Sequence, residues 1–351
     1  MSTKTKPNPQ AEGQLRQDPL TEKWVIVATD RAKRPTDFAS GYPKTSLNTP
    51  QYKDDCPFCN LSKYPQEPDI LRLPNDPDHW QVHIFANKYP ALTPNSEFKT
   101  WNVGPHKTAS AVGYHELLAT VHHNQTDNYA SEKNLALQLE ALAMRYRQLR
   151  TLDSVVYIQI IKNHGSDAGG SLEHPHHQIF TTPVLPSDVA DLLCGVEKYA
   201  KTHQTDPFQA IIDFEISDGS RLVYQNDDFI AFCPYASRQP FEVHIMPKKP
   251  LSKFDLITPD QLRSLAQSLK QVIGRLNQGV GNIPYNYYIN SAPCDTTGFI
   301  CAADSFPNFR WHLVILPRLN ELGGFEMGTG LEITTAIPEA SATFLREQKV
   351  A

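Results

Sequence analysis

The residues best suited to chemistry lie between residues 163 and 180, where a glycine-rich loop leads into a histidine-rich run. Glycine allows main-chain amides to approach a phosphate closely. The run alternates like a strand, so His174, His176 and Gln178 share one face while His177 faces away. An imidazole beside a phosphate can attack phosphorus and carry the phosphoryl group covalently. The alternative interpretation is a histidine-rich surface strand or a simple metal site.

A second candidate centre is the pair Cys56 and Cys59, whose Cys-x-x-Cys spacing is typical of metal chelation. One such pair needs two further ligands to complete a tetrahedral site. A reduced pair without metal is the alternative. The chain has six cysteines in 351 residues, which favours a reducing compartment over a disulfide framework, so we expect a cytoplasmic protein.

Bulk properties exclude several classes of protein. The net charge is −5, which argues against a protein that grips nucleic acid through its backbone charge. No apolar run is long enough to cross a membrane. The first 15 residues are polar, lack the apolar core of a signal peptide and are expected to form a mobile tail.

The elements that position these residues occur twice. A helix is predicted from Ser131 to about Arg150, followed by a strand over residues 155–161 that leads to the glycine loop. A second helix is predicted from Pro259 to Asn277, with Thr258 as its N-cap. The order strand, helix, strand, loop, strand thus repeats, which indicates an internal duplication.

Counting back from Pro183 and Pro317 places Arg310 opposite His176 in the second copy. We therefore expect one nucleophile, and one catalytic site, per chain.

The pattern His174-Pro-His176-x-Gln178 resembles the transferase branch of the histidine-triad superfamily, the galactose-1-phosphate uridylyltransferase family. Hydrolases of that superfamily carry a third histidine where this chain has Gln178. Glutamine can orient a phosphate but cannot cycle a proton to activate water, so transfer is favoured over hydrolysis. The resemblance extends from about Arg16 to Glu347, and parts of it look closer to the plant-type ADP-glucose phosphorylases.

The resemblance implies a structural zinc ion in a closed Cys2His2 site made by Cys56, Cys59, His115 and His174. Some relatives hold a second metal in the second half. Here His312 remains, but the neighbouring positions are Asn290 and Val314, so we expect no second metal.

The same resemblance suggests contacts to substrate. Nucleotide or phosphate contacts are assigned to Arg31, Arg34, Asn87, Asn163, Ser171 and Gln178, and sugar contacts to Phe325 and Glu326. From local sequence alone, the basic cluster would be solvated, the asparagine at 87 would be a turn residue and the glycine-rich tail would be a surface loop.

These observations predict an α+β protein of two tandem histidine-triad-like units on antiparallel sheets. The expected divisions are a tail (1–15), a first unit (16–186), a linker (187–206) and a second unit (207–351).

The expected function is nucleotidyl transfer through a covalent nucleotidyl-His176, with Gln178 assisting. The resemblance points to a UDP-glucose–hexose-1-phosphate uridylyltransferase, acting on a nucleotide sugar and a sugar 1-phosphate as a homodimer. An ADP-glucose or dinucleoside polyphosphate phosphorylase and a zinc-stabilised nucleotide-binding protein without turnover are the alternatives.

Overall fold

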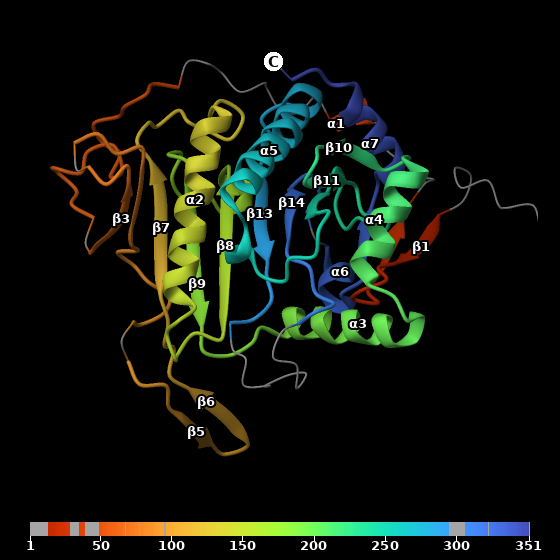
Figure 1. The fold of residues 1–351 in the computed structure, drawn as a ribbon, viewed down its shortest axis with the longest axis horizontal. Coiled ribbons are helices and arrows are strands. Elements are labelled where there is room, and N and C mark those ends of the chain that lie inside the picture. Colours follow the sequence, from red (N-terminus) through yellow and green to blue (C-terminus); the bar gives the residue numbers. More distant parts are fainter. Residues whose placement is uncertain are drawn as a thin grey trace, which may run out of the picture.

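The computed structural model describes residues 13–28, 35–38, 49–66, 68–76, 78–94, 96–294, 306–321 and 323–350. Its centre is a ten-stranded antiparallel sheet with the strand order β10-β11-β12-β14-β13-β8-β9-β7-β4-β3 (Figure 1). The first-half strands are β3 (Asp69–Leu73), β4 (Val82–Ala86), β7 (His115–Thr120), β8 (Tyr157–His164) and β9 (His176–Thr182). The second-half strands are β10 (Leu222–Gln225), β11 (Phe229–Phe232), β12 (Val243–Pro247), β13 (Tyr285–Asn290) and β14 (His312–Pro317).

The strand order confirms the predicted fold class, because it consists of two halves arranged about the central pair β8 and β13. In each half, a long helix stands between the third and fourth strands in sequence. These helices are α2 (Glu132–Leu149) and α5 (Pro259–Val280), which pack against each other across one face of the sheet (Figure 1). The opposite face is therefore left for the residues identified above.

Both long helices begin where the sequence predicts. The Ser131 side chain accepts a hydrogen bond from the Asn134 amide, as an N-cap does. Thr258 forms a full capping box with Gln261, and Pro259 is the first helical residue. Each helix then buries one apolar side; the buried leucines are Leu135, Leu139, Leu142, Leu149, Leu262, Leu265, Leu269 and Leu276.

A buried polar network lies beneath the central strands β8, β9 and β13, on the helix-covered face. The ammonium group of Lys162 on β8 is 2.5 Å from a carboxylate oxygen of Asp127, and Tyr285 on β13 donates to the other oxygen at 2.9 Å. His177 on β9 contacts the hydroxyl of Tyr287 on β13. The network thus links the three central strands that carry the site.

Smaller elements surround this core. They are the sheet β1 (Gln14–Gln17), β2 (Trp24–Val27) and β15 (Glu332–Thr334), the hairpin β5 (Thr100–Val103) and β6 (His106–Ala109), the helices α1 (Pro35–Phe38), α3 (Ser187–His203), α4 (Pro207–Asp218), α6 (Gly324–Thr329) and α7 (Pro338–Glu347), and the 3₁₀ turns η2 (Ser166–Ala168) and η3 (Phe254–Leu256). Within the described ranges, no helix combines the length and apolarity needed to span a membrane.

Candidate active site

His176 is the first residue of β9 and is buried, with its tautomer set by the main chain. Its Nδ1 lies 2.8 Å from the carbonyl oxygen of His174. A carbonyl oxygen only accepts, so Nδ1 carries the proton and Nε2 keeps its lone pair. Nε2 makes no hydrogen bond to any described residue. Burial lowers the pKa of His176, so the imidazole is neutral and its free nitrogen is a nucleophile.

Gln178 lies two residues further on the same face of β9, and its orientation is set by His115. The main-chain amide of Ala91 donates to Nδ1 of His115 at 3.2 Å, so the proton of that imidazole resides on Nε2. Nε2 then donates to Oε1 of Gln178 at 2.9 Å. Since its oxygen is engaged, Gln178 presents its NH2 group as a donor suited to a phosphate oxygen.

His115 is itself held in place by its neighbours. Its ring stacks on Phe180 with 3.9 Å between centroids, and the Asn87 side chain lies 3.0 Å from its Nε2. Burial lowers the pKa of His115, which keeps the ring neutral. Asn87 therefore lies next to β9, beside His115, which orients Gln178.

The glycine loop is closed by its own hydrogen bonds. Gly165 and Gly169 have φ angles of 84° and 78°, which side chains rarely tolerate. The amides of residues 168, 169 and 170 donate within the loop, so these three amides are not free to bind a phosphate. Asn163 faces the loop, since its Nδ2 donates to the carbonyl oxygen of Gly169 at 3.5 Å, while its oxygen accepts from Asn286 on β13 at 2.8 Å.

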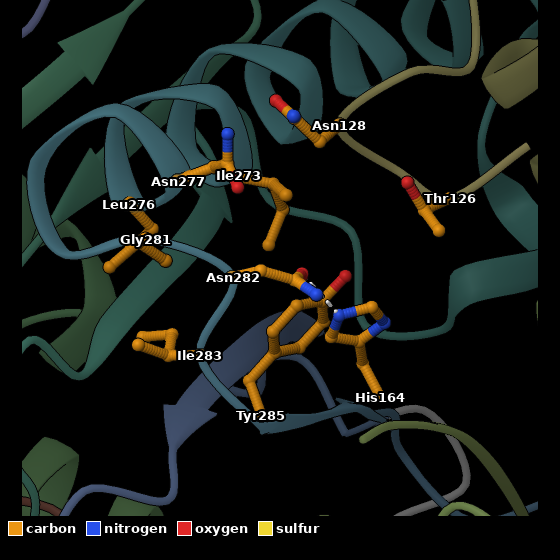
Figure 2. Close-up of a pocket in the computed structure, with 10 residues that line it drawn as sticks. All are labelled: Thr126, Asn128, His164, Ile273, Leu276, Asn277, Gly281, Asn282, Ile283 and Tyr285. Carbon is orange, nitrogen blue, oxygen red and sulfur yellow. Dashed lines mark hydrogen bonds between the residues drawn. The ribbon is translucent and has the colours of Figure 1, made fainter. Parts of the chain in front are cut away.

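The end of β8 is anchored on the other side by His164. Its ring stacks on Tyr285 and its Nε2 lies 2.7 Å from the Asn282 side-chain oxygen (Figure 2). The cavity beside them measures about 10 Å³, which has room for one water molecule rather than a substrate. The contacts of His164 in this region therefore support the end of β8 and the glycine loop that follows it.

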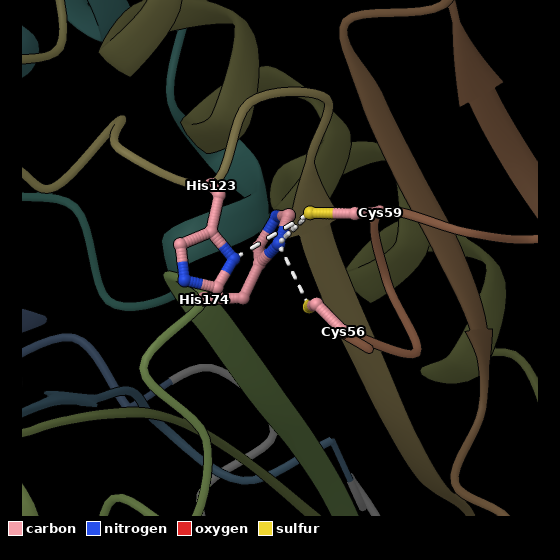
Figure 3. Close-up of side chains that lie close together, drawn as sticks. All are labelled: Cys56, Cys59, His123 and His174. Atoms are coloured by element: carbon pink, nitrogen blue, oxygen red, sulfur yellow. Dashed lines mark hydrogen bonds between the residues drawn. The ribbon is translucent and has the colours of Figure 1, made fainter. Parts of the chain in front are cut away.

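Cys56, Cys59 and His174 lie together, but the second histidine of the group is His123 (Figure 3). The sulfur of Cys59 is 3.5 Å from Nδ1 of His123 and 3.4 Å from Nδ1 of His174. The sulfur of Cys56 is also 3.5 Å from Nδ1 of His174. Four donor atoms within 4.8 Å of one another fit a tetrahedral ion with bonds of about 2.0–2.3 Å.

The assignment of His115 as a metal ligand is wrong, and strand pairing explains why. β7 and β9 are antiparallel, so His115 at the start of β7 pairs with Phe180 near the end of β9. His174 precedes β9 and lies at the other end of β7, where its Nε2 is 2.7 Å from the Thr120 carbonyl oxygen. A ligand that meets His174 must therefore follow β7, as His123 does.

The contacts around these donors suit a metal. Nε2 of His174 donates to a carbonyl, which leaves Nδ1 as the ligand atom, and burial lowers its pKa to about 4. Nε2 of His123 lies 3.4 Å from a carboxylate oxygen of Glu173, which is paired with Lys53. Burial raises the pKa of Cys59 to about 11, so a bound cation is needed to make it a thiolate.

Phe58, within the Cys-x-x-Cys segment, joins this group to the nucleophile. Its ring meets the rings of His174 and His176 edge-on, with centroids 5.6 and 5.5 Å away. Sequence reasoning did not identify Phe58, His123 or the orienting role of His115. A histidine three residues after a strand carries no motif, so only the paired strands reveal it.

The other residues that were predicted to contact the substrate lie outside β9. Arg31 and Arg34 fall outside the described residues. Ser171 is exposed after the glycine loop. Phe325 and Glu326 lie on α6, a short helix rather than the expected loop, and no residue of α6 is buried. Their contact with a sugar stays a prediction.

The second-half counterpart of His176 is His312, not Arg310 as counting from the prolines predicted. Each histidine opens the corresponding strand, β9 or β14, and each has Nδ1 on the carbonyl oxygen two residues earlier, at 2.8 and 3.1 Å. Arg310 thus matches His174. The count was wrong because Pro317 is the last residue of β14, whereas Pro183 follows β9.

His312 differs from His176 in the state of its second nitrogen. Asn290 lies with Nδ2 3.0 Å from Nε2 of His312 and donates to it. Burial also lowers the pKa of His312 to about 3. Its lone pair is therefore occupied, which supports a single nucleophile per chain. The absence of a second metal stays a prediction.

Comparison with known proteins agrees with this geometry. Residues 4–186 match the family model of the N-terminal domain of galactose-1-phosphate uridyl transferase. The ADP-glucose phosphorylase of Arabidopsis thaliana is 32% identical over 338 residues, which cover 95% of this chain and 92% of the relative. The galactose-1-phosphate uridylyltransferase of Thermotoga maritima is 28% identical over 347 residues, covering 96% and 99%.

A similar solved structure is that of the Arabidopsis thaliana ADP-glucose phosphorylase with bound ADP-glucose. It is 28% identical, covers 97% of this chain and 100% of its own, and superposes with a TM-score of 0.79.

Proposed function

Because the chain belongs to the galactose-1-phosphate uridyl transferase family, we propose that it transfers a nucleotidyl group through a covalent bond to His176. The observation that carries this proposal is the free Nε2 lone pair of His176, fixed by the Nδ1 hydrogen bond to the His174 carbonyl oxygen. The enzyme is accordingly a nucleotidyltransferase. Its own residues account for the two steps of the proposed reaction.

In the first step, Nε2 of His176 attacks the α-phosphorus of a nucleoside diphosphate sugar. The bond to the bridging oxygen breaks, and the sugar 1-phosphate leaves with the electron pair. The imidazole becomes positively charged as the N–P bond forms. The Nδ1–H bond to the His174 carbonyl stabilises that charge, and the NH2 group of Gln178 stabilises a phosphate oxygen.

In the second step, a phosphate oxygen of the acceptor attacks the same phosphorus, and His176 leaves as neutral imidazole. Water competes poorly because neither group beside the phosphorus acts as a base. Gln178 has no ionisable proton, and the low pKa of His115, with its Nε2–H committed to Gln178, leaves no proton acceptor there. Transfer between phosphates therefore dominates over hydrolysis.

Cys56, Cys59, His123 and His174 would hold a structural zinc ion. All four positions are protein ligands, so such an ion supplies rigidity and leaves no position for substrate. Its effect on the reaction passes through His174, whose carbonyl oxygen fixes the tautomer of His176.

The proposed reaction is that of a UDP-glucose–hexose-1-phosphate uridylyltransferase, in line with the family and with the uridylyltransferase relatives. An ADP-glucose phosphorylase is the second candidate, because that relative shares 32% identity over almost the whole chain. The two activities share the His176 step and differ in the base of the donor and in the acceptor, which is a hexose 1-phosphate or inorganic phosphate.

We further propose a homodimer in which α6 of one chain, with Phe325 and Glu326, serves the site of the other. The exposure of α6, in which no residue is buried, supports this arrangement. A cytoplasmic location is also proposed, because all five cysteines in the described part of the chain are free thiols.

Turnover assays test the function directly. The purified protein is given UDP-glucose with galactose 1-phosphate and, separately, ADP-glucose with inorganic phosphate, and the products are separated by ion-exchange chromatography. UDP-galactose from the first mixture supports the uridylyltransferase. ADP from the second supports the phosphorylase. Turnover of either pair by a His176→Ala variant would overturn the proposed mechanism.

A further inference from the structure

The second half of the sheet carries a large cavity on the same face as His176. Its volume is about 1060 Å³, and β8, β12, β13 and β14 form its floor. The walls are α3, α4 and the β1–β2 turn. This space, here called the second-half cavity, is large enough for a small organic ligand.

The cationic groups among the described residues that line the second-half cavity are paired with carboxylates. Arg221 is 2.8 Å from Glu215, and Lys23 is 2.8 Å from Asp188. Arg238 is 2.9 Å from Glu242, and also donates to the hydroxyl of Tyr288. Among the described residues that line the cavity, every lysine and arginine is thus paired with a carboxylate, so this part of the wall offers no unpaired cation to a phosphate.

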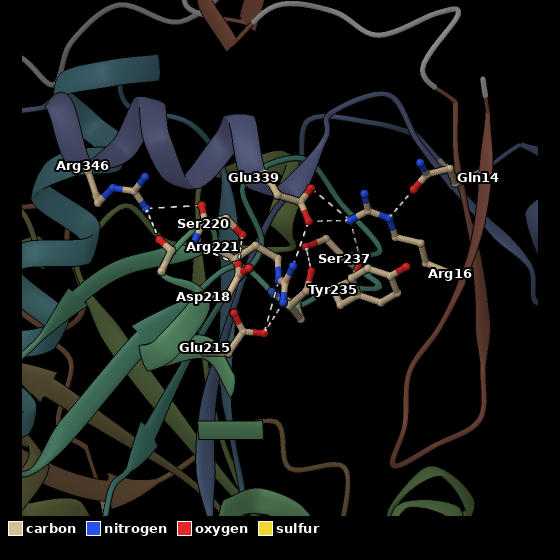
Figure 4. Close-up of polar contacts among 12 residues, drawn as sticks. Gln14, Arg16, Glu215, Asp218, Ser220, Arg221, Tyr235, Ser237, Glu339 and Arg346 are labelled. Carbon is tan, nitrogen blue, oxygen red and sulfur yellow. Dashed lines mark hydrogen bonds and ion pairs between the residues drawn. The ribbon is translucent and has the colours of Figure 1, made fainter. Parts of the chain in front are cut away.

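One wall is made rigid by a network that ties the chain ends together. Glu339 on α7 accepts hydrogen bonds from Arg16 on β1 at 3.0 Å and from Arg221 at 2.9 Å (Figure 4). Both guanidinium groups lie over the Tyr235 ring, 4.5 and 5.3 Å from its centroid. These contacts hold Tyr235 in place where it lines the cavity, and Phe214 on α4, whose ring Arg221 also overlies at 5.5 Å, is a second aromatic residue of the lining.

The floor repeats the arrangement of the catalytic site without its nucleophile. His312 stands where the first half has His176, and its Nε2 is occupied by Asn290. The carboxamide oxygen of Asn290 accepts no hydrogen bond from any described residue. It is a neutral acceptor on the floor of the cavity, placed for a hydroxyl or amino donor.

We propose that the second-half cavity binds an uncharged ligand that combines a flat ring with hydroxyl groups, which is the chemistry of a nucleoside without phosphate. Aromatic walls suit the ring, the Asn290 oxygen suits a hydroxyl, and paired charges disfavour phosphate. The choice of a nucleoside rests on the proposed function, since the duplicated first half would bind a nucleotide.

Equilibrium dialysis with adenosine and uridine, and with AMP and UMP for comparison, tests the proposal. The test variant is Ala210→Trp, which fills the cavity from α4. The matched control is Ile216→Trp, which adds the same ring to an exposed position of α4 outside the cavity. At least one nucleoside should bind the wild type and the Ile216 variant alike, and bind Ala210→Trp at least tenfold more weakly at this site. The monophosphates should show no binding that Ala210→Trp removes.

Several results would overturn the proposal. They are the absence of nucleoside binding at millimolar concentration, equal nucleoside binding by Ala210→Trp and wild type, or loss of AMP or UMP binding in Ala210→Trp. If light scattering shows that only the Ala210 variant dissociates, the cavity holds a second copy of the chain instead. Adduct formation on His176 is measured in parallel, so failure of the proposed function is seen separately from failure of this site.

Discussion

The hydrogen bond from Nδ1 of His176 to the carbonyl oxygen of His174 spans 2.8 Å and joins a residue of the candidate metal site to the proposed nucleophile. The side chain of His174 faces the sulfurs of Cys56 and Cys59, while its main chain fixes the tautomer of His176. The candidate metal site and the proposed nucleophile thus contact the same residue, His174, one through its side chain and the other through its main chain. The contributions of the metal site and of the nucleophile can be measured separately.

Metal content should distinguish the two histidines near β7. The wild-type protein should carry about one zinc ion per chain, and His123→Ala, which removes a proposed ligand, should carry far less when zinc is measured by plasma mass spectrometry. His115→Ala should retain the zinc, because His115 contacts Gln178 and Phe180 instead. The reverse pattern would restore His115 as the ligand and refute the assignment made from the structure.

His115 should matter for turnover through Gln178. Removing Gln178 deletes a phosphate donor, and one such donor is worth about 10²-fold in kcat. His115→Ala leaves the donor present but free to rotate, so kcat should fall about tenfold with little change in KM. A mainly raised KM in steady-state assays would show that His115 binds substrate rather than orienting Gln178.

The buried pair Lys162–Asp127 should contribute strongly to the stability of β8 and the strands beside it. Lys162→Met leaves a buried carboxylate unpaired, which costs about 3–5 kcal/mol of unfolding free energy. The control is Lys198→Met, which breaks an exposed pair with Glu22 and should cost no more than about 1 kcal/mol. Denaturant unfolding measures both. Equal losses would mean that the buried network contributes no more than a surface pair.

Acid stability should depend on Glu242. Burial alone would raise its pKa, but Arg238 and His244 outweigh burial and lower it from 4.5 to about 2. A depressed folded-state pKa stabilises the protein above the unfolded pKa, and this contribution is lost as the pH falls from about 4.5 to about 2.

Glu242→Gln removes that contribution. Over this pH window its unfolding free energy should fall less steeply than that of the wild type, as measured by urea titration at several pH values. Parallel slopes for the two proteins would contradict the pKa shift.

Much of the fold follows from local sequence. The cap residues Ser131 and Thr258 and the leucine spacing predict both long helices, and the repeated element order predicts the duplicated sheet. These features depend on residues close together in the chain, so they can be deduced without tertiary structure.

The site could be predicted only in part. His176 and Gln178 belong to one strand, whose alternation predicts that they share a face, and the resemblance to the family assigns their roles. His115 and His123 are eight positions apart, and only the antiparallel pairing of β7 with β9 decides which of them meets His174. The match of His176 with His312 also needed the bounds of the strands, because Pro317 is the last residue of β14 whereas Pro183 follows β9.

The most direct test is the intact mass of the protein after brief incubation with UDP-glucose or ADP-glucose, followed by mapping of the modified residue. Wild-type protein should gain one nucleotidyl group per chain on Nε2 of His176, and His176→Ala should gain none. His312→Ala should still form the adduct, because Asn290 occupies the corresponding nitrogen of His312 in the native protein. A wild-type chain that stays unmodified with both donors, or an adduct on a residue other than His176, would contradict the mechanism.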